Sequence, residues 1–266
     1  MNRSVSIETD KTTHYICISN RGSGVPTIFL HGFTGSHHSW DEVVKRFKRS
    51  AITLDLPGHG KSTFNNLDTD YSIEDWCEDF NEILNSLDIN QIDLCGYSMG
   101  GRLAISFAAK YPDKINKLIL ESVSYGIEDK KNRRERFQED LKLAHFIEKD
   151  LPRFVQKWEN SPLFLKQKDR SSYGFLSQQK DRLSHNPKQL SKALKSFSQG
   201  NMDSYKESFE KFQFPITVIN GSEDIKYAEK GKILSAINQN VKRFVIDLAG
   251  HNTHLENLRS FIDCLK

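Results

Sequence analysis

Short apolar runs alternate along the chain with longer segments in which apolar residues recur every three or four positions. The short runs are rich in β-branched and aromatic residues, as buried strands are, whereas the wider spacing predicts amphipathic helices. This alternation indicates an α/β fold with a mostly parallel central sheet and helices on both faces. The predicted helices cover residues 73–87 and 99–110, and the predicted strands cover residues 14–19, 27–32, 51–56, 91–97, 117–123, 216–221 and 243–249.

The pattern changes in the middle of the chain. Residues 124–212 lack strand signals and consist of charged, helix-forming segments, which three prolines divide into about four helices. Strand patterns resume at residue 216. We therefore interpret residues 124–212 as a helical cap inserted between two strands of one sheet, and residues 1–123 and 213–266 together as the core.

Charge is distributed unevenly along the 266 residues. The formal net charge is +3, with 37% hydrophobic and 27% charged residues, which is ordinary for a soluble folded protein. Such a small net charge does not indicate nucleic acid or a membrane surface as a partner. Residues 124–200, however, contain 17 Lys and Arg against 10 Asp and Glu. This excess suggests a face that meets small anions; a solvated, lysine-rich helical surface is the alternative.

The cysteines give no sign of a metal site or a disulfide framework. Cys17, Cys77, Cys95 and Cys264 are far apart and form no CxxC pair, so we expect neither a zinc site nor a redox pair. The first residues lack the apolar region of a secretion signal, and no stretch approaches the roughly 18 apolar residues of a membrane span. We therefore expect a cytoplasmic protein; the sequence gives no prediction of its oligomeric state.

A short motif with a reactive serine follows one of the predicted strands. Gly96, Tyr97, Ser98, Met99 and Gly100 match the pattern G-x-S-x-G and lead directly into a predicted helix. In this motif a sharp strand-to-helix turn exposes the serine hydroxyl, and glycines are needed because the turn packs closely against its neighbours. The motif predicts Ser98 as a catalytic serine; a plain Gly/Ser turn is the alternative.

An acid and a histidine follow two later strands in the order that this motif requires. Asp224 comes just after the strand at 216–221, and His251 comes just after the last predicted strand. Because the carboxyl ends of parallel strands share one edge of a sheet, we expect both side chains near Ser98. Asp224 would then orient His251, which would accept the serine proton. Glu223 is the competing acid.

The remaining histidines have no evident place in this scheme. We expect His37, His38 and His254 to be surface or loop histidines. The run from His251 to His254 lacks the glutamate of an HExxH zinc site. We therefore predict no metal.

A second loop is typical of an oxyanion-binding site. Residues 31–35 read His-Gly-Phe-Thr-Gly after a predicted strand. In the α/β-hydrolase fold, such a loop donates one backbone N–H to a developing oxyanion, and the residue after the serine donates another. The backbone amides of Phe33 and Met99 are thus the predicted donors. Together with the ordered serine, acid and histidine, this loop predicts the α/β-hydrolase fold.

Three longer segments carry a closer resemblance. GYSMGGR, DLPGHGKS and AGHNTHLEN resemble the MenH family of menaquinone biosynthesis, the 2-succinyl-6-hydroxy-2,4-cyclohexadiene-1-carboxylate (SHCHC) synthases. The resemblance covers nearly the whole chain. It implies a lyase that eliminates pyruvate from SEPHCHC to give SHCHC without a cofactor. It also implies that Ser98, activated by His251 and Asp224, acts as a base on a ring C–H and forms no acyl-enzyme.

The resemblance further implies residues that bind a small substrate with several carboxylates. Arg102 follows the serine at a fixed helical distance, and Arg136 matches a binding position in the cap, with Arg133 one turn earlier on the same helix face. A guanidinium can bind a carboxylate through two hydrogen bonds, which suits this substrate class. The alignment with the family reaches Arg182 only across a gap in the cap. The implied set is Tyr97, Arg102, Arg133, Arg136, Trp158 and Arg182.

Other functions of the same fold stay open. The main alternative is a carboxylic-ester or C–C bond hydrolase in which Ser98 is a covalent nucleophile, since most proteins with this triad are hydrolases. A ligand receptor without catalytic activity is a second alternative. A haloalkane dehalogenase is disfavoured because its chemistry requires a carboxylate where Ser98 stands.

Overall fold

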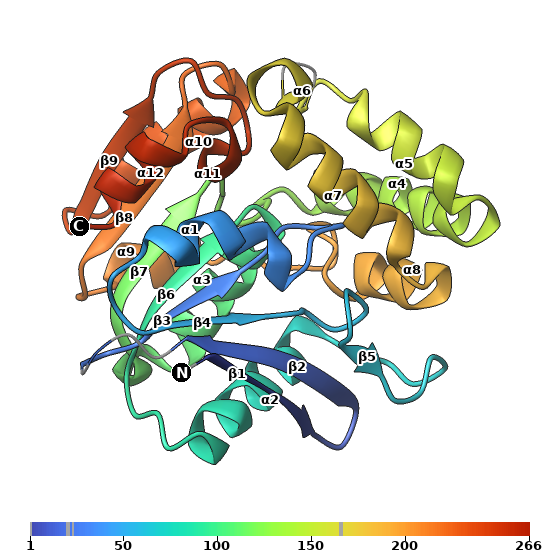
Figure 1. Ribbon diagram of the computed structural model, residues 1–266, viewed down its shortest axis with the longest axis horizontal. Coiled ribbons are helices and arrows are strands. Elements are labelled where there is room, and N and C mark those ends of the chain that lie inside the picture. Colours follow the sequence, from blue (N-terminus) through green and yellow to red (C-terminus); the bar gives the residue numbers. More distant parts are fainter. Residues whose placement is uncertain (1, 20–21, 23, 165–166) are drawn as a thin grey trace.

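The protein is built around one twisted sheet (Figure 1). The computed structural model describes residues 2–19, 22, 24–164 and 167–266. The strand order is β1-β2-β4-β3-β6-β7-β8-β9, with β5 paired to β2. Strand β2 is antiparallel to its neighbours, and the strands from β4 through β9 in this order are parallel. The strands are β1 (Asn2–Glu8), β2 (Thr12–Ser19), β3 (Thr27–Leu30), β4 (Ala51–Leu54), β5 (Thr63–Phe64), β6 (Ile92–Tyr97), β7 (Ile115–Glu121), β8 (Ile216–Gly221) and β9 (Val241–Ile246).

The predicted strands are present, and two strands were not predicted. Strands β3, β4, β6 and β8 are buried throughout, which agrees with their continuous apolar runs. Strand β1 (NRSVSIE) lies at an edge of the sheet and alternates apolar with polar residues, so its sequence resembles an exposed terminus. The short β5 is held by its pairing with β2. Pairing with β2, and not the local sequence pattern, therefore accounts for both β1 and β5.

Helices cover both faces of the sheet. Helices α1 and α12 pack on one face, where Phe29 and Ile219 meet Trp40 and Phe261. Helices α2, α3, α9 and α10 pack on the other face. The helices outside the cap are α1 (Asp41–Arg46), α2 (Ile73–Ser86), α3 (Met99–Lys110), α9 (Lys206–Lys211), α10 (Ile225–Ile237), α11 (Thr253–Glu256) and α12 (Leu258–Cys264), with 3₁₀ helices η1 (His37–Trp40) and η2 (Pro112–Lys114).

Five helices between β7 and α9 form what we call the cap, α4–α8. They are α4 (Lys130–Lys149), α5 (Leu151–Glu159), α6 (Gln167–Arg170), α7 (Ser172–Ser184) and α8 (Pro187–Ser196). They lie together at the upper right of Figure 1, and α4, α5 and α8 share an apolar core of their own around Ile147, Phe154 and Leu190. Pro152 and Pro187 stand in the first turns of α5 and α8, where a missing N–H costs nothing. Two of the prolines that divide this region therefore begin helices.

The last part of residues 124–212 belongs with the core. Helix α9 packs on the sheet through Phe209, and the Asn238 side chain, after α10, donates to the carbonyl oxygens of Phe209 and Phe212. The segment also contains more helices than the four that its prolines suggested.

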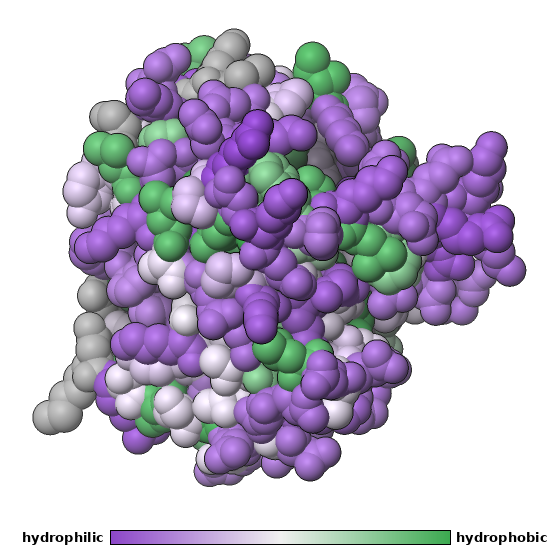
Figure 2. All heavy atoms as spheres, turned by 90° about the vertical axis from the view of Figure 1, so that its right-hand side faces the viewer, coloured by the Kyte–Doolittle hydropathy of each residue, from purple (hydrophilic) through white to green (hydrophobic). Residues whose placement is uncertain are grey.

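The cap side of the molecule is mostly hydrophilic (Figure 2). Lys130, Lys131 and Arg134 are exposed at the start of α4. Much of the basic excess of this region is therefore solvated surface, as the alternative interpretation held. In the described part of the chain, no helix combines the length and the apolar character needed to span a membrane.

Candidate active site

Ser98 stands on a sharp turn between β6 and α3. Its backbone has φ 50° and ψ −106°, a strained positive-φ conformation that a non-glycine residue adopts only under the constraint of its surroundings. The flanking glycines allow close packing: a Cβ on Gly96 would lie 2.5 Å from the carbonyl oxygen of Gly100, and a Cβ on Gly100 would lie 2.5 Å from that of Leu30. The G-x-S-x-G pattern thus has the strand–turn–helix geometry expected of it.

Asp224, His251 and Ser98 form one chain of hydrogen bonds. Nδ1 of His251 lies 2.5 Å from Oδ2 of Asp224, and Nε2 lies 3.0 Å from Oγ of Ser98. Asp224 also caps α10 by accepting from the Tyr227 N–H at 3.3 Å. The competing acid, Glu223, instead forms an ion pair with Arg170. The structure therefore brings together the three residues that the sequence predicted, from the ends of β6, β8 and β9.

This arrangement can move a proton from the serine hydroxyl. When the carboxylate accepts from Nδ1, the imidazole has the tautomer whose Nε2 can take the Ser98 proton. The Asp224 and His251 side chains are 5% and 2% exposed, so water does not compete strongly for either group. The carboxylate can then stabilise the positive charge that forms on the ring.

The loop at residues 31–35 lies against the serine. A Cβ on Gly32 would come within 2.7 Å of the Tyr97 ring and 3.6 Å of the Ser98 Cβ. His31 fixes the loop because its Nδ1 contacts the Gly32 carbonyl oxygen at 2.8 Å while its Nε2 accepts from the Leu56 N–H at 2.9 Å. Burial lowers the pKa of His31 to about 4, which keeps this ring neutral. Phe33 and Met99 both line the adjacent cavity; their role as amide donors remains a prediction.

A cavity of about 350 Å³ lies between the triad and the cap. Its walls are mostly apolar, and its size suits a small molecule. Tyr97 and Trp158, two of the predicted binding residues, are among the lining side chains. The lining side chains are Phe33, Tyr97, Ser98, Met99, Arg102, Arg136, Asp140, Leu143, Trp158, Ser161, Pro162, Leu163, Phe164, Leu194, Phe197, Ser198, Lys226, Tyr227 and His251.

Arg102 places a buried cation in this cavity. Helix α3 carries it one turn beyond Ser98, and its Nη2 donates to the Phe197 carbonyl oxygen at 3.1 Å. Its Nε has no hydrogen-bond partner among the described residues. Burial lowers the pKa of Arg102 to about 10, so the group is still charged at neutral pH. A buried guanidinium with an unused donor is suited to an anionic ligand.

Arg136 also lines the cavity but already has a carboxylate partner. Its Nε lies 3.0 Å from both oxygens of Asp140, one turn further along α4. Asp140 also accepts from the Ser198 hydroxyl at 2.7 Å. This pairing positions the Arg136 guanidinium and offsets part of its charge.

Two cap arginines do not occupy the places that the resemblance implied. Arg133 donates to Asp203 at 2.5 Å and to the Met202 carbonyl oxygen, in a separate surface recess. Arg133 and Arg136 are only about 60° apart around α4, but the contacts with Asp203 and Met202 hold the Arg133 side chain away from the cavity that Arg136 lines. Arg182 is buried, and within the described chain it is not among the cavity-lining residues.

Arg182 instead joins the cap to the loop at residues 31–35. Its guanidinium donates to Glu159 and Gln178 at 3.0 Å each and to the Thr34 hydroxyl at 3.3 Å. These partners use the donors that a substrate carboxylate would need. Arg182 therefore holds the cap over Phe33 rather than facing the cavity.

Sequence reasoning missed Tyr227 and Lys226. The Tyr227 ring centroid lies 4.6 Å from that of His251, and both residues line the cavity. Tyr227 stands three residues after Asp224 at the start of α10, so a helix beginning at the acid was the available signal. Among the described residues, no group of three or more His, Cys, Asp or Glu side chains could hold a metal ion.

The interpretation of two other histidines was wrong. His254 is fully buried, with Nδ1 2.6 Å from Oε2 of Glu121, and His37 is buried with Nδ1 2.8 Å from Oδ1 of Asp55. Only His38 is largely exposed, as expected of a loop histidine. Buried imidazoles need polar partners, and sequence spacing does not reveal partners so distant along the chain.

Comparisons with known proteins agree with this fold. The chain belongs to the α/β-hydrolase-fold family, because residues 25–258 match the family model described as alpha/beta hydrolase fold. It is 36% identical, over 88% of its length and 86% of the relative's, to a putative SHCHC synthase of Bacillus subtilis (strain 168). It is 31% identical to the SHCHC synthase of Klebsiella pneumoniae (strain 342), over 93% of this chain and 95% of that one.

A solved structure points to the same family. "Structure of MenH from S. aureus" superposes with a TM-score of 0.88 at 27% identity and covers 97% of each chain. Within the α/β-hydrolase fold, the chain is therefore a member of the SHCHC synthase family.

Proposed function

We propose that this protein eliminates pyruvate from SEPHCHC to give SHCHC in menaquinone biosynthesis, with Ser98, His251 and Asp224 as its base. The observation that carries the proposal is the position of Arg102. Its buried guanidinium, with an unused Nε donor, lines the same 350 Å³ cavity as Ser98 and His251. A site for neutral esters would gain nothing from burying this charge, whereas a substrate with several carboxylates would compensate its desolvation.

The charges around the cavity suit a small anion. Among the described residues that line it, Arg102, Arg136 and Lys226 are cationic and Asp140 is the one carboxylate. Trp158 and Ser161 add buried polar atoms, Nε1 and Oγ, that have no partner among the described residues. Unused donors beside excess positive charge favour an acceptor-rich ligand. We infer a substrate with several carboxylates, one of them bound by Arg102.

The proposed step balances as a base-catalysed elimination. His251 accepts the Ser98 proton, and the serine oxygen removes a proton from a ring carbon of SEPHCHC. The electron pair of that C–H bond forms a ring double bond, while the C–O bond to the enolpyruvyl group breaks. His251 passes its proton to the leaving group, which departs as pyruvate, and Ser98 keeps the ring proton as its hydroxyl hydrogen. No bond forms between Ser98 and carbon, which separates this step from hydrolase chemistry.

The loop at residues 31–35 has a role in this proposal. Charge develops on a carbonyl oxygen of the substrate when the ring proton is removed, and the amides of Phe33 and Met99 would donate to it. Each such donor contributes on the order of 3 kcal/mol to transition-state stabilisation. Tyr97, Trp158 and Tyr227 supply aromatic walls that keep water from the reacting carbon.

Product analysis tests the proposal against a hydrolase of the same fold. The purified protein is incubated with SEPHCHC and, separately, with p-nitrophenyl esters, and pyruvate and p-nitrophenol are followed. We expect rapid pyruvate release and little ester cleavage. Fast ester cleavage without pyruvate would identify a hydrolase that uses Ser98 as a nucleophile. Full biological activity of a Ser98→Ala variant would instead identify a receptor without catalysis.

A further inference from the structure

Three buried histidines pack together at the loop of residues 31–35, and no step of the proposed elimination uses them. They are His31 in the loop itself, His59 in the DLPGHGKS segment, and His185 between α7 and α8 of the cap. The ring centroids of His31 and His59 lie 5.0 Å apart, and those of His59 and His185 lie 5.4 Å apart, both edge to face. Each residue is at most 4% exposed. The cluster therefore joins the cap to two segments of the core.

Each of the three rings accepts a hydrogen bond from a backbone N–H. Nδ1 of His185 accepts from Gly60 at 3.2 Å, and Nε2 of His59 accepts from Thr34 at 3.3 Å. Nε2 of His31 accepts in the same way, at 2.9 Å. A protonated imidazole has no acceptor, so the three rings are neutral and carry their proton on the other nitrogen. Burial lowers the pKa of all three rings, in agreement with this assignment.

These bonds converge on Thr34. Its φ is 67°, in the left-handed region that a β-branched residue rarely adopts, so the surrounding structure must hold it there. His59 accepts from its N–H, and the Nε2–H of His185 donates to its carbonyl oxygen at 3.0 Å. Nε of Arg182 donates to its hydroxyl at 3.3 Å. Two of these three partners, His185 and Arg182, belong to the cap.

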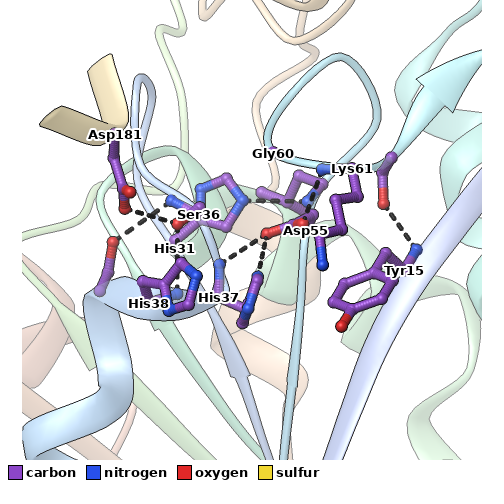
Figure 3. A network of polar contacts seen from close by, with 12 residues as sticks. Tyr15, His31, Ser36, His37, His38, Asp55, Gly60, Lys61 and Asp181 are labelled. Atoms are coloured by element: carbon purple, nitrogen blue, oxygen red, sulfur yellow. Dashed lines mark hydrogen bonds and ion pairs between the residues drawn. The ribbon is translucent and has the colours of Figure 1, made fainter. Parts of the chain in front are cut away.

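The cap reaches the loop from one short segment, residues 181–185. Besides Arg182 and His185, this segment contains Asp181, which accepts at 2.6 Å from the hydroxyl of Ser36, the residue directly after the loop. Figure 3 shows this bond between the cap and the core. The backbone of the loop is therefore coupled to the position of the cap through hydrogen bonds as well as through packing.

Phe33, the neighbour of Thr34, has the amide that we propose as an oxyanion donor. Its ring lies between core and cap, with the His59 ring centroid 5.6 Å away and that of Trp158 5.7 Å away, both nearly perpendicular. An oxyanion donor is effective only when it is already aimed at the oxygen on which charge develops. Because Thr34 directly follows Phe33, a shift of its backbone would move this donor.

We propose that His185 is a positioning residue of the cap, which holds the Thr34 carbonyl so that the Phe33 amide is aimed at the oxyanion of the substrate. The inference rests on the proposed function and deepens it, because it makes the rate of proton removal depend on the docked cap. Both the donor on Nε2 and the acceptor on Nδ1 are needed. Since the aimed amide acts on charge that develops in the transition state, kcat and not KM reports its loss.

Pyruvate release from SEPHCHC by His185→Phe and His185→Gln tests this role. Phenylalanine keeps a planar ring but neither hydrogen bond, whereas glutamine keeps a donor and an acceptor on one planar group. We expect kcat to fall about tenfold or more in His185→Phe, with KM within about twofold of wild type, and most of kcat to be recovered in His185→Gln. His145→Phe, at an exposed histidine of α4, is the matched control and should keep the wild-type kcat.

Three results of this comparison would overturn the proposal. They are an unchanged kcat in His185→Phe, a loss confined to KM, and a loss in His185→Gln as large as that in His185→Phe. The ester assay separates this inference from the proposed function. If the wild type cleaves p-nitrophenyl esters and releases no pyruvate, the proposed function fails, but the loop still serves a developing oxyanion and the same variants are compared on the ester.

NMR of the isotope-labelled histidine rings in the wild-type protein tests the cluster without any variant. At neutral pH we expect His185 as the neutral tautomer protonated on Nε2, and His31 and His59 as neutral tautomers protonated on Nδ1. An imidazolium at His185, or the opposite tautomer there, would overturn the proposal, because the ring could not then accept from Gly60 and donate to Thr34. This measurement decides the matter even if His185→Phe does not fold.

Discussion

His251 and His254 stand three residues apart, and each holds a carboxylate on Nδ1, Asp224 at 2.5 Å and Glu121 at 2.6 Å. The two pairs differ at the other ring nitrogen. Nε2 of His251 meets the Ser98 hydroxyl at the cavity, whereas Nε2 of His254 is buried without a partner in the described chain and its ring stacks on Trp40. Two similar His–carboxylate pairs can therefore have different roles, one at the cavity and one in the core, and the group that contacts Nε2 determines the role.

The Glu121–His254 pair supports the loop that carries His251, the proposed catalytic histidine. Glu121 ends β7 beside Tyr97 of β6, and it accepts from the Thr253 hydroxyl at 2.6 Å and from the His254 N–H at 2.9 Å. Its own carbonyl oxygen accepts from the Ser98 N–H at 2.9 Å. One buried residue thus ties the serine turn to the segment that follows His251.

The largest expected effect separates the two histidines directly. His251→Ala removes the proposed proton acceptor, so kcat for pyruvate release from SEPHCHC should fall by about 10⁴-fold or more. His254→Ala leaves His251 in place, so its kcat should fall far less. Steady-state kinetics of both purified variants check this. Equal losses in kcat would break the distinction between the two pairs.

Arg102 should have the next largest effect. Arg102→Ala removes the buried cation that we propose binds a substrate carboxylate, so transition-state stabilisation should fall by some 2–4 kcal/mol, measured as kcat/KM. Arg133→Ala is the matched control, since Arg133 pairs with Asp203 outside the cavity, and it should keep the wild-type value. An unchanged kcat/KM for Arg102→Ala would remove this residue from the site.

The Glu121–His254 pair should contribute measurably to the free energy of unfolding. His254→Ala leaves the buried carboxylate of Glu121 with fewer donors and removes a ring that packs on Trp40, so the free energy of unfolding should fall by about 2 kcal/mol. Urea denaturation measures it. His38→Ala, at an exposed histidine, is the control and should change the midpoint little. A loss no larger than that of the control would show that the pair contributes nothing to the fold.

The last prediction concerns His37 and depends on pH. Its pKa is raised from 6.5 to about 10 in the folded protein, so the folded state holds an additional proton between these values. The stabilisation from the pair with Asp55 is then fully present below pH 6.5 and is lost as pH rises through about 10. The difference in unfolding free energy between wild type and His37→Gln should therefore shrink over this range. A constant difference would contradict the charged pair.

The fold and the triad were predictable because their signals are local. Ser98, Asp224 and His251 each follow an apolar strand, and parallel strands bring their carboxyl ends to one edge. The contacts of the cap side chains were less predictable. Helical spacing tells which residues share a face of a helix, but not which residues of other elements pack against that face. Arg133 meets Asp203, and Arg182 meets Glu159, only through tertiary packing.

Pyruvate release by wild type and Ser98→Ala, assayed side by side on SEPHCHC, tests the central claim that the serine–histidine pair removes the ring proton. We predict steady release by the wild type and a loss of several orders of magnitude in Ser98→Ala, with the folded structure retained. Pyruvate release by Ser98→Ala at the wild-type rate would contradict the account, because some other group would then be the base.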